Sequence, residues 1–319
     1  MNISSEAAFH QKTLEIFNYQ YHNNTIYRQF CDALHTDITS VKQITEIPFL
    51  PISFYKQHKI ITGHFDTVEL IFESSGTTSE NTSTHYVADE QLYKTSLTAG
   101  FKQFYGNIED YTIIALLPSY IERPNASLVY MAKVLMSISN QPDNGFYLNE
   151  WEQLANTLNK LEASGKKTLL LGVTFALLDF AEQYSLSLKN TIIMETGGMK
   201  GRREELTRKQ VHAILNHKFG TSQIHSEYGM TELLSQAYST ANGIFLPTHT
   251  MKVLIRDIND PLDVRTIGNG CLNIIDLSNI YSCSFIATDD IGIVHENGSF
   301  EVLGRSDHSI LRGCNLMIV

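Results

Sequence analysis

Residues 168–195 read TLLLGVTFALLDFAEQYSLSLKNTIIME, and this stretch decides the class of fold. It opens and closes on short apolar runs, 168–173 and 191–195, which are typical of buried strands. The window between them, as far as Tyr184, has the apolar spacing of a helix. A strand, a helix and a second strand in succession predict an α/β fold, in which layers of largely parallel strands are flanked by helices.

The same alternation extends outward from this stretch. Upstream, the spacing of apolar residues predicts helices within the first forty residues, a strand over 112–117, and helices over 126–138 and 151–162. Two prolines in IPFLPISFYKQHKI, residues 47–60, exclude a regular helix there. Downstream, a charged helix is predicted from Arg203.

Beyond about Leu246 the pattern changes. The runs MKVLIRD, CLNIID, SFIAT and FEVLG are separated by turn residues, with no helical window between them. This pattern predicts an antiparallel or barrel-like β-rich sub-domain. We therefore expect an α/β core over residues 1–245 and a β-rich sub-domain over 246–319 that completes the functional site.

The composition argues against several classes of protein. Of 319 residues, 43% are hydrophobic and 18% charged, which is enough to bury a sizeable core. The net charge of -10 gives no electrostatic reason to bind nucleic acid. The longest apolar run, 169–180, is too short to span a bilayer. The four cysteines, Cys31, Cys271, Cys283 and Cys314, are scattered without a CxxC pair. This spacing indicates reduced thiols in a cytoplasmic protein.

The first motif with chemical meaning is ESSGTTS, residues 73–79, directly after the apolar run VELIF. Small residues around a glycine, Ser75-Gly76-Thr77-Thr78, offer backbone N–H groups and hydroxyls that suit a polyphosphate. The motif lacks the GxxxxGK[ST] pattern, so it does not hold a nucleotide as a P-loop does. An ordinary Ser/Thr-rich surface loop fits these residues equally well.

The second motif is YGMTE, residues 228–232. Its ring, glycine, hydroxyl and carboxylate could together stack on a base, bond a phosphate oxygen and ligate Mg²⁺. The alternative is a turn into a helix over LLSQAYS with Thr231 as its N-cap. His85 and His225 flank the first two motifs, and we expect ordinary hydrogen-bonding roles for both.

The third motif is ATDDIG, residues 287–292, followed by GRSD, residues 304–307. Asp290, at the end of a strand, is suited to accept both hydroxyls of a ribose, and Arg305 could bond the sugar or a phosphate. The alternative is that DDIG, residues 289–292, and ENGS, residues 296–299, are simply hairpin turns.

In their order, these motifs resemble the signature series of the adenylate-forming enzymes, which include acyl-CoA synthetases, luciferases and phenylacetate-CoA ligases. The resemblance spans residues 73–313. It implies that the phosphates of ATP are cradled by Ser75, Gly76, Thr77 and Thr78, and that the adenine contacts the segment with Gly197 and Gly198 and packs on Tyr228, with Gly229 beside it. It also implies that Thr231 bonds the α-phosphate or the carboxylate and that Glu232 holds Mg²⁺. Asp290 would take the ribose hydroxyls, with Arg305 nearby.

Further phrases resemble the short acyl-protein synthetases that feed the fatty acid reductases of bacterial luminescence. These phrases are LPSYIER at 117–123, RGC at 312–314 and IPFLPISFYK at 47–56. Two departures from the usual pattern of the adenylate-forming enzymes point to the same branch. The usual phosphate loop has a Lys shortly after its glycine, and residues 79–83 contain none. The sequence also stops twelve residues after Asp307, where the usual enzyme continues into a small mobile domain. We therefore expect the N-terminal domain of an adenylate-forming enzyme without that small domain.

The resemblance implies a cytoplasmic ligase that uses ATP and Mg²⁺ to activate a carboxylic acid, expected to be a fatty acid, as an acyl adenylate. It places the cysteine that then receives the acyl group as a thioester at Cys314. The expected partner is an acyl-accepting reductase or carrier protein, with no nucleic acid and no membrane span. The alternatives are an acyl- or aryl-CoA ligase that uses free coenzyme A, a scaffold that has lost catalysis, and a Cys314 buried in a final strand.

Overall fold

The structure, a computed structural model, describes residues 3, 5–74, 82–117, 125–197 and 206–306. The chain begins with two helices, α1 (Glu6–Asn23) and α2 (Thr25–Ala33). Asn24 separates them because its extended backbone ends α1, while its side-chain oxygen accepts the Tyr27 N–H at 3.0 Å and so caps α2. A short strand, β1 (Leu50–Pro51), and one helical turn, α3 (Phe54–Gln57), follow.

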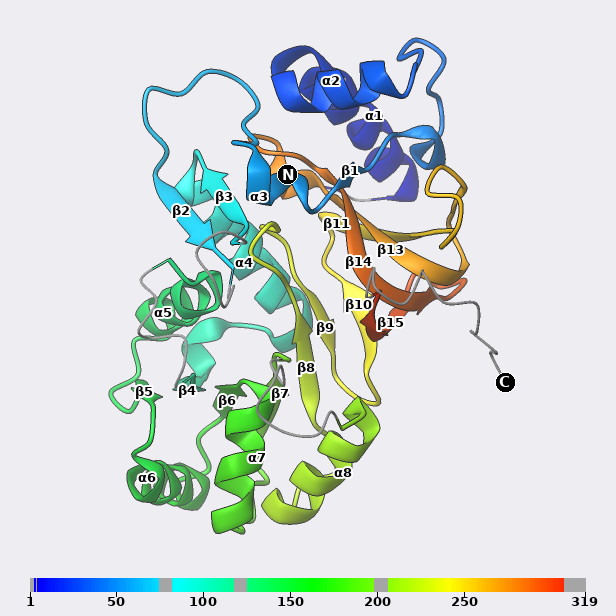
Figure 1. Cartoon of the computed structure of the whole chain (residues 1–319). Coiled ribbons are helices and arrows are strands. Elements are labelled where there is room, and N and C mark those ends of the chain that lie inside the picture. The colour runs from blue at the N-terminus through cyan, green and yellow to red at the C-terminus, as the bar shows by residue number, and fades with distance from the viewer. Residues whose placement is uncertain (1–2, 4, 75–81, 118–124, 198–205, 307–319) are drawn as a thin grey trace.

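The middle of the chain builds the parallel half of the main sheet (Figure 1). Its strands lie in the order β5-β4-β6-β7-β8, and each neighbouring pair is parallel. β4 and β6 are buried at every residue, which explains their unbroken apolar sequences. The elements are α4 (Glu90–Tyr105), β4 (Thr112–Leu116), α5 (Ser127–Ser139), β5 (Gly145–Tyr147), α6 (Trp151–Ala163), β6 (Thr168–Gly172), α7 (Thr174–Gln183), β7 (Thr191–Glu195), α8 (Arg208–Phe219) and β8 (His225–Tyr228).

The sheet continues from β8 into an antiparallel half, in the order β9-β10-β15-β14-β13-β11-β12, and β1 pairs in parallel with β14. A separate hairpin contains β2 (Leu70–Glu73) and β3 (Thr84–Val87), which lie on either side of the Ser/Thr-rich motif. The remaining strands are β9 (Ala237–Ser239), β10 (Ile244–Pro247), β11 (Met251–Arg256), β12 (Val264–Arg265), β13 (Gly268–Asp276), β14 (Phe285–Val294) and β15 (Phe300–Arg305), and a short 3-10 helix, η3 (Leu277–Asn279), follows β13.

Each half of the sheet has its own apolar core. The first packs the parallel strands against α4 to α8. The second packs the N-terminal helices against the antiparallel strands at the other end of the molecule (Figure 1). In the second core the rings of Phe17, Tyr27 and Phe285 meet, with the Tyr27 and Phe285 centroids 5.9 Å apart in a stacked arrangement. The first and last parts of the chain are therefore packed together.

The structure confirms the α/β class, the parallel middle and the antiparallel runs after Leu246. The charged helix begins later than predicted, at Arg208, because Thr207 and Gln210 form a capping box. Residues 54–57 form a helical turn where none was predicted, because both prolines lie before it. The domain boundary at 245/246 stays a prediction, since β10 crosses it and pairs with β9 on one side and β15 on the other.

Candidate nucleotide site

Tyr228 ends β8 with its ring in an aromatic cradle. The ring meets Phe245 of β10 and Phe300 of β15 edge-on, at centroid distances of 5.9 and 5.3 Å. Its hydroxyl donates to the Asp290 carboxylate at 2.8 Å. Burial, reinforced by the negative charge of Asp290, raises the pKa of Tyr228 well above its usual value, so the hydroxyl remains a donor. The second and third sequence motifs therefore meet at this contact.

Asp290 lies on β14 directly opposite Arg305 of β15. The Arg305 Nε donates to the Asp290 carboxylate at 3.2 Å, so the third motif is a cross-strand ion pair. The Thr288 hydroxyl accepts the Asp290 N–H at 3.1 Å, and Arg256 donates to the Thr288 carbonyl at 2.6 Å. The hairpin-turn alternative is therefore wrong for DDIG, which lies within β14, whereas it is right for ENGS, which forms the turn between β14 and β15. The Arg305 side chain is 53% exposed, so this pair contributes geometry more than stability.

The loop that follows Tyr228, residues 229–235, carries Thr231 and Glu232. At Gly229, where this loop begins, a Cβ would stand 2.3 Å from a carboxylate oxygen of Glu227, so a larger residue would require the Glu227 side chain to move. The predicted alternative of a helix capped by Thr231 is wrong, since the chain runs through turns into the strand β9. Hydrogen bonds from distant side chains hold the loop instead.

The Asp276 carboxylate, buried at the end of β13, accepts the Leu234 N–H at 2.8 Å and the Ser235 N–H at 2.9 Å. The Asn279 amide donates to the Glu232 carbonyl at 2.8 Å. His85 of β3 contacts the Thr231 carbonyl through Nδ1 at 2.8 Å. The expectation of a hydrogen-bonding role for His85 is confirmed.

The Glu232 carboxyl is buried, and the Ser83 side chain hydrogen-bonds to it. Burial raises the pKa of Glu232, whereas the Ser83 hydrogen bond and the charge of Arg305 act in the opposite direction. In the described parts of the chain, no three His, Cys, Asp or Glu side chains gather into a metal cluster. One carboxylate fits Mg²⁺, because this ion is typically held by one or two carboxylates together with the phosphates of its nucleotide.

Glu195, at the end of β7, organises the segment that carries Gly197. Its carboxylate accepts the Gly197 N–H at 2.7 Å and the Thr174 hydroxyl. Arg208 Nε and His212 Nε2 of α8 lie 3.7 and 3.9 Å from the same carboxylate. Burial raises the pKa of Glu195, but the contact with His212, the charge of Arg208 and the other donors outweigh it and lower the pKa to about 2.

Gly197 itself has a backbone φ of +78°, a conformation that favours glycine, and among the described residues nothing would lie within 4 Å of a Cβ there. Its N–H donates to Glu195 and its carbonyl accepts the Thr174 N–H at 2.8 Å, so both of its backbone polar groups are paired. Several predicted site residues lie outside the described residues, and these are Ser75, Gly76, Thr77, Thr78, Gly198 and Cys314.

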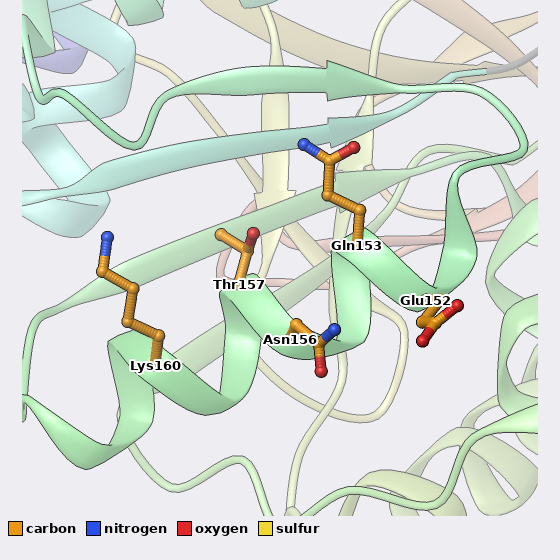
Figure 2. Close-up of a pocket in the computed structure, with 5 residues that line it drawn as sticks. All are labelled: Glu152, Gln153, Asn156, Thr157 and Lys160. Atoms are coloured by element: carbon orange, nitrogen blue, oxygen red, sulfur yellow. The ribbon is translucent and has the colours of Figure 1, made fainter.

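Figure 2 shows an open hollow along α6, lined by five side chains of that helix. It shares no residue with the motifs above. Its lining consists of charged, amide and hydroxyl side chains of one helix, none of which is a buried polar group aimed at a ligand. We therefore assign the hollow no function. The residues concerned are Glu152, Gln153, Asn156, Thr157 and Lys160.

Sequence reasoning did not find the polar residues that support the site. Glu195 and Asp276 each end a buried apolar run, TIIME and CLNIID, and a carboxylate in that position is the signal that could have found them. Asn279 offered no signal, because an Asn after a strand usually marks a turn.

The fold is shared with ligases of known structure. A 2-hydroxyisobutyryl-CoA ligase in complex with its acyl-AMP and CoA superposes with a TM-score of 0.71 at 12% identity, over 95% of this chain and 68% of the ligase. ATP-bound MatB from Rhodopseudomonas palustris gives a TM-score of 0.56 at 15% identity, over 77% of this chain. The chain spans about half the length of MatB, because the match covers 49% of that protein.

The fold is that of the adenylate-forming ligases. A family model described as "Acyl-protein synthetase, LuxE" matches residues 3–319, and the chain belongs to this acyl-protein synthetase family. The long-chain-fatty-acid–luciferin-component ligases of Vibrio harveyi and Aliivibrio fischeri are 26% and 25% identical to it. These matches cover 94% and 95% of this chain and 84% and 85% of the relatives. In the part of the chain that the structure describes, no helix has the length and apolarity needed to cross a bilayer.

Proposed function

We propose that this enzyme joins a long-chain fatty acid to a thiol in two steps, with ATP as the source of energy. In the first step a carboxylate oxygen attacks the α-phosphorus of ATP, the bond to pyrophosphate breaks, and an acyl adenylate forms. In the second step a thiolate attacks the acyl carbon, the bond to AMP breaks, and a thioester forms. A bound Mg²⁺ would neutralise charge on the phosphates.

The meeting of Tyr228, Asp290 and Arg305 is the observation that carries the first step. Asp290 already takes one donor on each carboxylate oxygen, and its remaining lone pairs can accept two ribose hydroxyls. Glu232 supplies a carboxylate for the metal, and the absence of described atoms within 4 Å of a Cβ at Gly197 supports the proposed place of the adenine. Fatty acid specificity is proposed from the names of the curated relatives.

The cysteines support the second step at Cys314. The other three, Cys31, Cys271 and Cys283, are buried free thiols. Burial raises the pKa of each of them, that of Cys31 to about 12, so they remain protonated and poorly nucleophilic. Cys314 is the one cysteine left to carry the acyl group. Unpaired thiols also support the cytoplasmic location that the sequence predicts.

Pyrophosphate release across a panel of carboxylic acids tests the first step. We expect release with long-chain fatty acids that requires ATP and Mg²⁺ and is independent of coenzyme A. Release that depends on coenzyme A would favour the CoA ligase alternative. No release with any acid would favour the scaffold.

A labelled fatty acid tests the second step. Incubation with ATP and Mg²⁺ should give a hydroxylamine-sensitive label on the chain, and Cys314→Ser should lose the label while still releasing pyrophosphate. Cys271→Ser is the matched control and should keep the label. A label that persists in Cys314→Ser would contradict the assignment. The onward acceptor, an acyl-accepting reductase or carrier protein, would be identified by transfer of the label to it.

A further inference from the structure

The beginning of β3 lies against the loop that carries Glu232. Ser83 and His85 flank Thr84 at the start of β3, so their side chains leave the strand on the same face. Ser83 hydrogen-bonds to the Glu232 carboxyl, and His85 contacts the Thr231 carbonyl. Two side chains on one face of this segment therefore contact two successive residues of the loop.

The His85 ring is held by contacts with Thr231, Asn279 and Tyr55. Its ring is fully buried, and the Tyr55 ring meets it edge-on with centroids 5.7 Å apart. Its Nε2 lies 3.0 Å from the amide oxygen of Asn279. The Asn279 nitrogen donates to the carbonyls of Glu232 and Cys283, at 2.8 and 3.0 Å, and this leaves the oxygen to face His85.

Both ring nitrogens of His85 therefore face acceptors, the Thr231 carbonyl and the Asn279 oxygen. A neutral imidazole carries a single N–H, so it can donate to one of them. The Thr231 contact is the shorter, at 2.8 Å against 3.0 Å. We assign the proton to Nδ1, where it fixes the backbone from which the Glu232 side chain projects.

We propose that His85 is a positioning residue: through the Thr231 carbonyl it sets the direction of the Glu232 carboxylate. This inference rests on the proposed function, because it takes Glu232 as the Mg²⁺ carboxylate. Residues that orient a metal ligand typically account for about 10- to 100-fold in metal affinity or activity. We expect an effect of that size.

Three substitutions separate the two ring nitrogens. His85→Asn places an amide where Nδ1 lies and can keep the bond to the Thr231 carbonyl. His85→Gln places an amide where Nε2 lies and can keep only the contact with Asn279. His85→Ala keeps neither. The matched control is His225→Asn, at a partly buried histidine of β8 whose ring contacts the Tyr105 hydroxyl at 3.2 Å and not the loop.

The first measurement is the rise in melting temperature that Mg²⁺ produces at a fixed ATP concentration. His85→Ala and His85→Gln should require at least about tenfold more Mg²⁺ for half of the rise. His85→Asn and the control should require the same Mg²⁺ concentration as the parent protein. An unchanged requirement in His85→Ala would overturn the proposal.

The second measurement needs no ligand. Hydrogen exchange in peptides that cover residues 229–236 should be faster in His85→Ala and His85→Gln than in His85→Asn, whereas exchange in α7 should be unchanged. Equal behaviour of the Asn and Gln variants, whether both are protected or both unfold, would overturn the proposal. If the parent protein shows no Mg²⁺-dependent shift, the proposed function fails, and hydrogen exchange still decides the role of His85.

Discussion

Asp290 is the residue that joins the other parts of the candidate nucleotide site, because its carboxylate accepts hydrogen bonds from both the Tyr228 hydroxyl and the Arg305 Nε. We predict that Asp290→Ala abolishes the rise in melting temperature produced by MgATP. Hydrogen bonds to a charged group each contribute about 1.5–3 kcal/mol, so losing the two ribose contacts should weaken binding by at least about a hundredfold. Asp263→Ala, which removes an exposed surface ion pair with Arg265, should leave the shift intact. A normal shift in Asp290→Ala would contradict the proposed ribose contact.

Glu227, the neighbour of Tyr228, is predicted to make the protein less stable as the pH rises. Burial and the negative charge of Glu195 raise its pKa to about 8, so it is neutral in the folded protein at neutral pH. A carboxyl whose pKa is raised by folding contributes stability below its unfolded pKa, and that contribution is lost as the pH rises through the folded pKa.

Glu227→Gln should therefore remove this pH dependence. Urea unfolding at about pH 8 should show the variant to be more stable than the parent by about 1–3 kcal/mol, and the two should converge near pH 5. A difference between the two proteins that is the same at both pH values would show that Glu227 does not titrate in this range.

At the scale of elements, Glu195 joins β7 to α8. Arg208 of α8 also lies over the Phe245 ring of β10, at 5.0 Å from its centroid, and donates to the Val302 carbonyl of β15 at 3.1 Å. Arg208 therefore links the Glu195 carboxylate, which lies in the parallel half next to the Gly197 backbone, to two strands of the antiparallel half.

We predict that Glu195→Gln destabilises the protein by about 2–4 kcal/mol at neutral pH, because Arg208 loses its buried partner. The pKa of Glu195 is lowered to about 2, so the contribution is complete above the unfolded pKa and is lost as the pH falls through the folded pKa. Chemical unfolding of parent and variant should converge at acid pH. Glu152→Gln, on the outer face of α6, is the control and should change stability by less than about 0.5 kcal/mol.

The elements were more predictable from sequence than the contacts between them. The runs 112–116 and 168–172 are buried on both faces, so their apolar sequences identified them as strands, and the alternation of strands with helices indicated that they are parallel. Asp290 and Arg305 were predicted to lie close together, and their register across β14 and β15 confirms it. The roles of His85, Asn279 and Asp276 could not be predicted, because each acts on backbone groups far away in the sequence.

At the scale of the whole molecule, α1 contributes to the support of the site from the opposite end of the chain. Gln20, fully buried, donates to the Asn279 and Ile280 carbonyls at 3.1 and 2.9 Å and accepts the Ser284 N–H at 2.9 Å. Gln20→Ala should lower the free energy of unfolding by about 2–4 kcal/mol, because these buried groups lose their partner. Gln11→Ala, which removes an exposed contact with Glu15, should change it by less than about 0.5 kcal/mol. Similar unfolding midpoints for the two variants would contradict this account.

The packing of α1 and α2 on the C-terminal strands also bears on how the protein is made. The ribosome delivers Phe17 and Tyr27 early, yet their partner Phe285 emerges only when most of the chain has been translated. The parallel half, whose core residues are contiguous between Leu97 and Tyr238, can collapse in the meantime. The aromatic rings of α1 and α2 therefore stay uncovered while the residues between them and Phe285 are translated, and they are buried only after the parallel half can collapse.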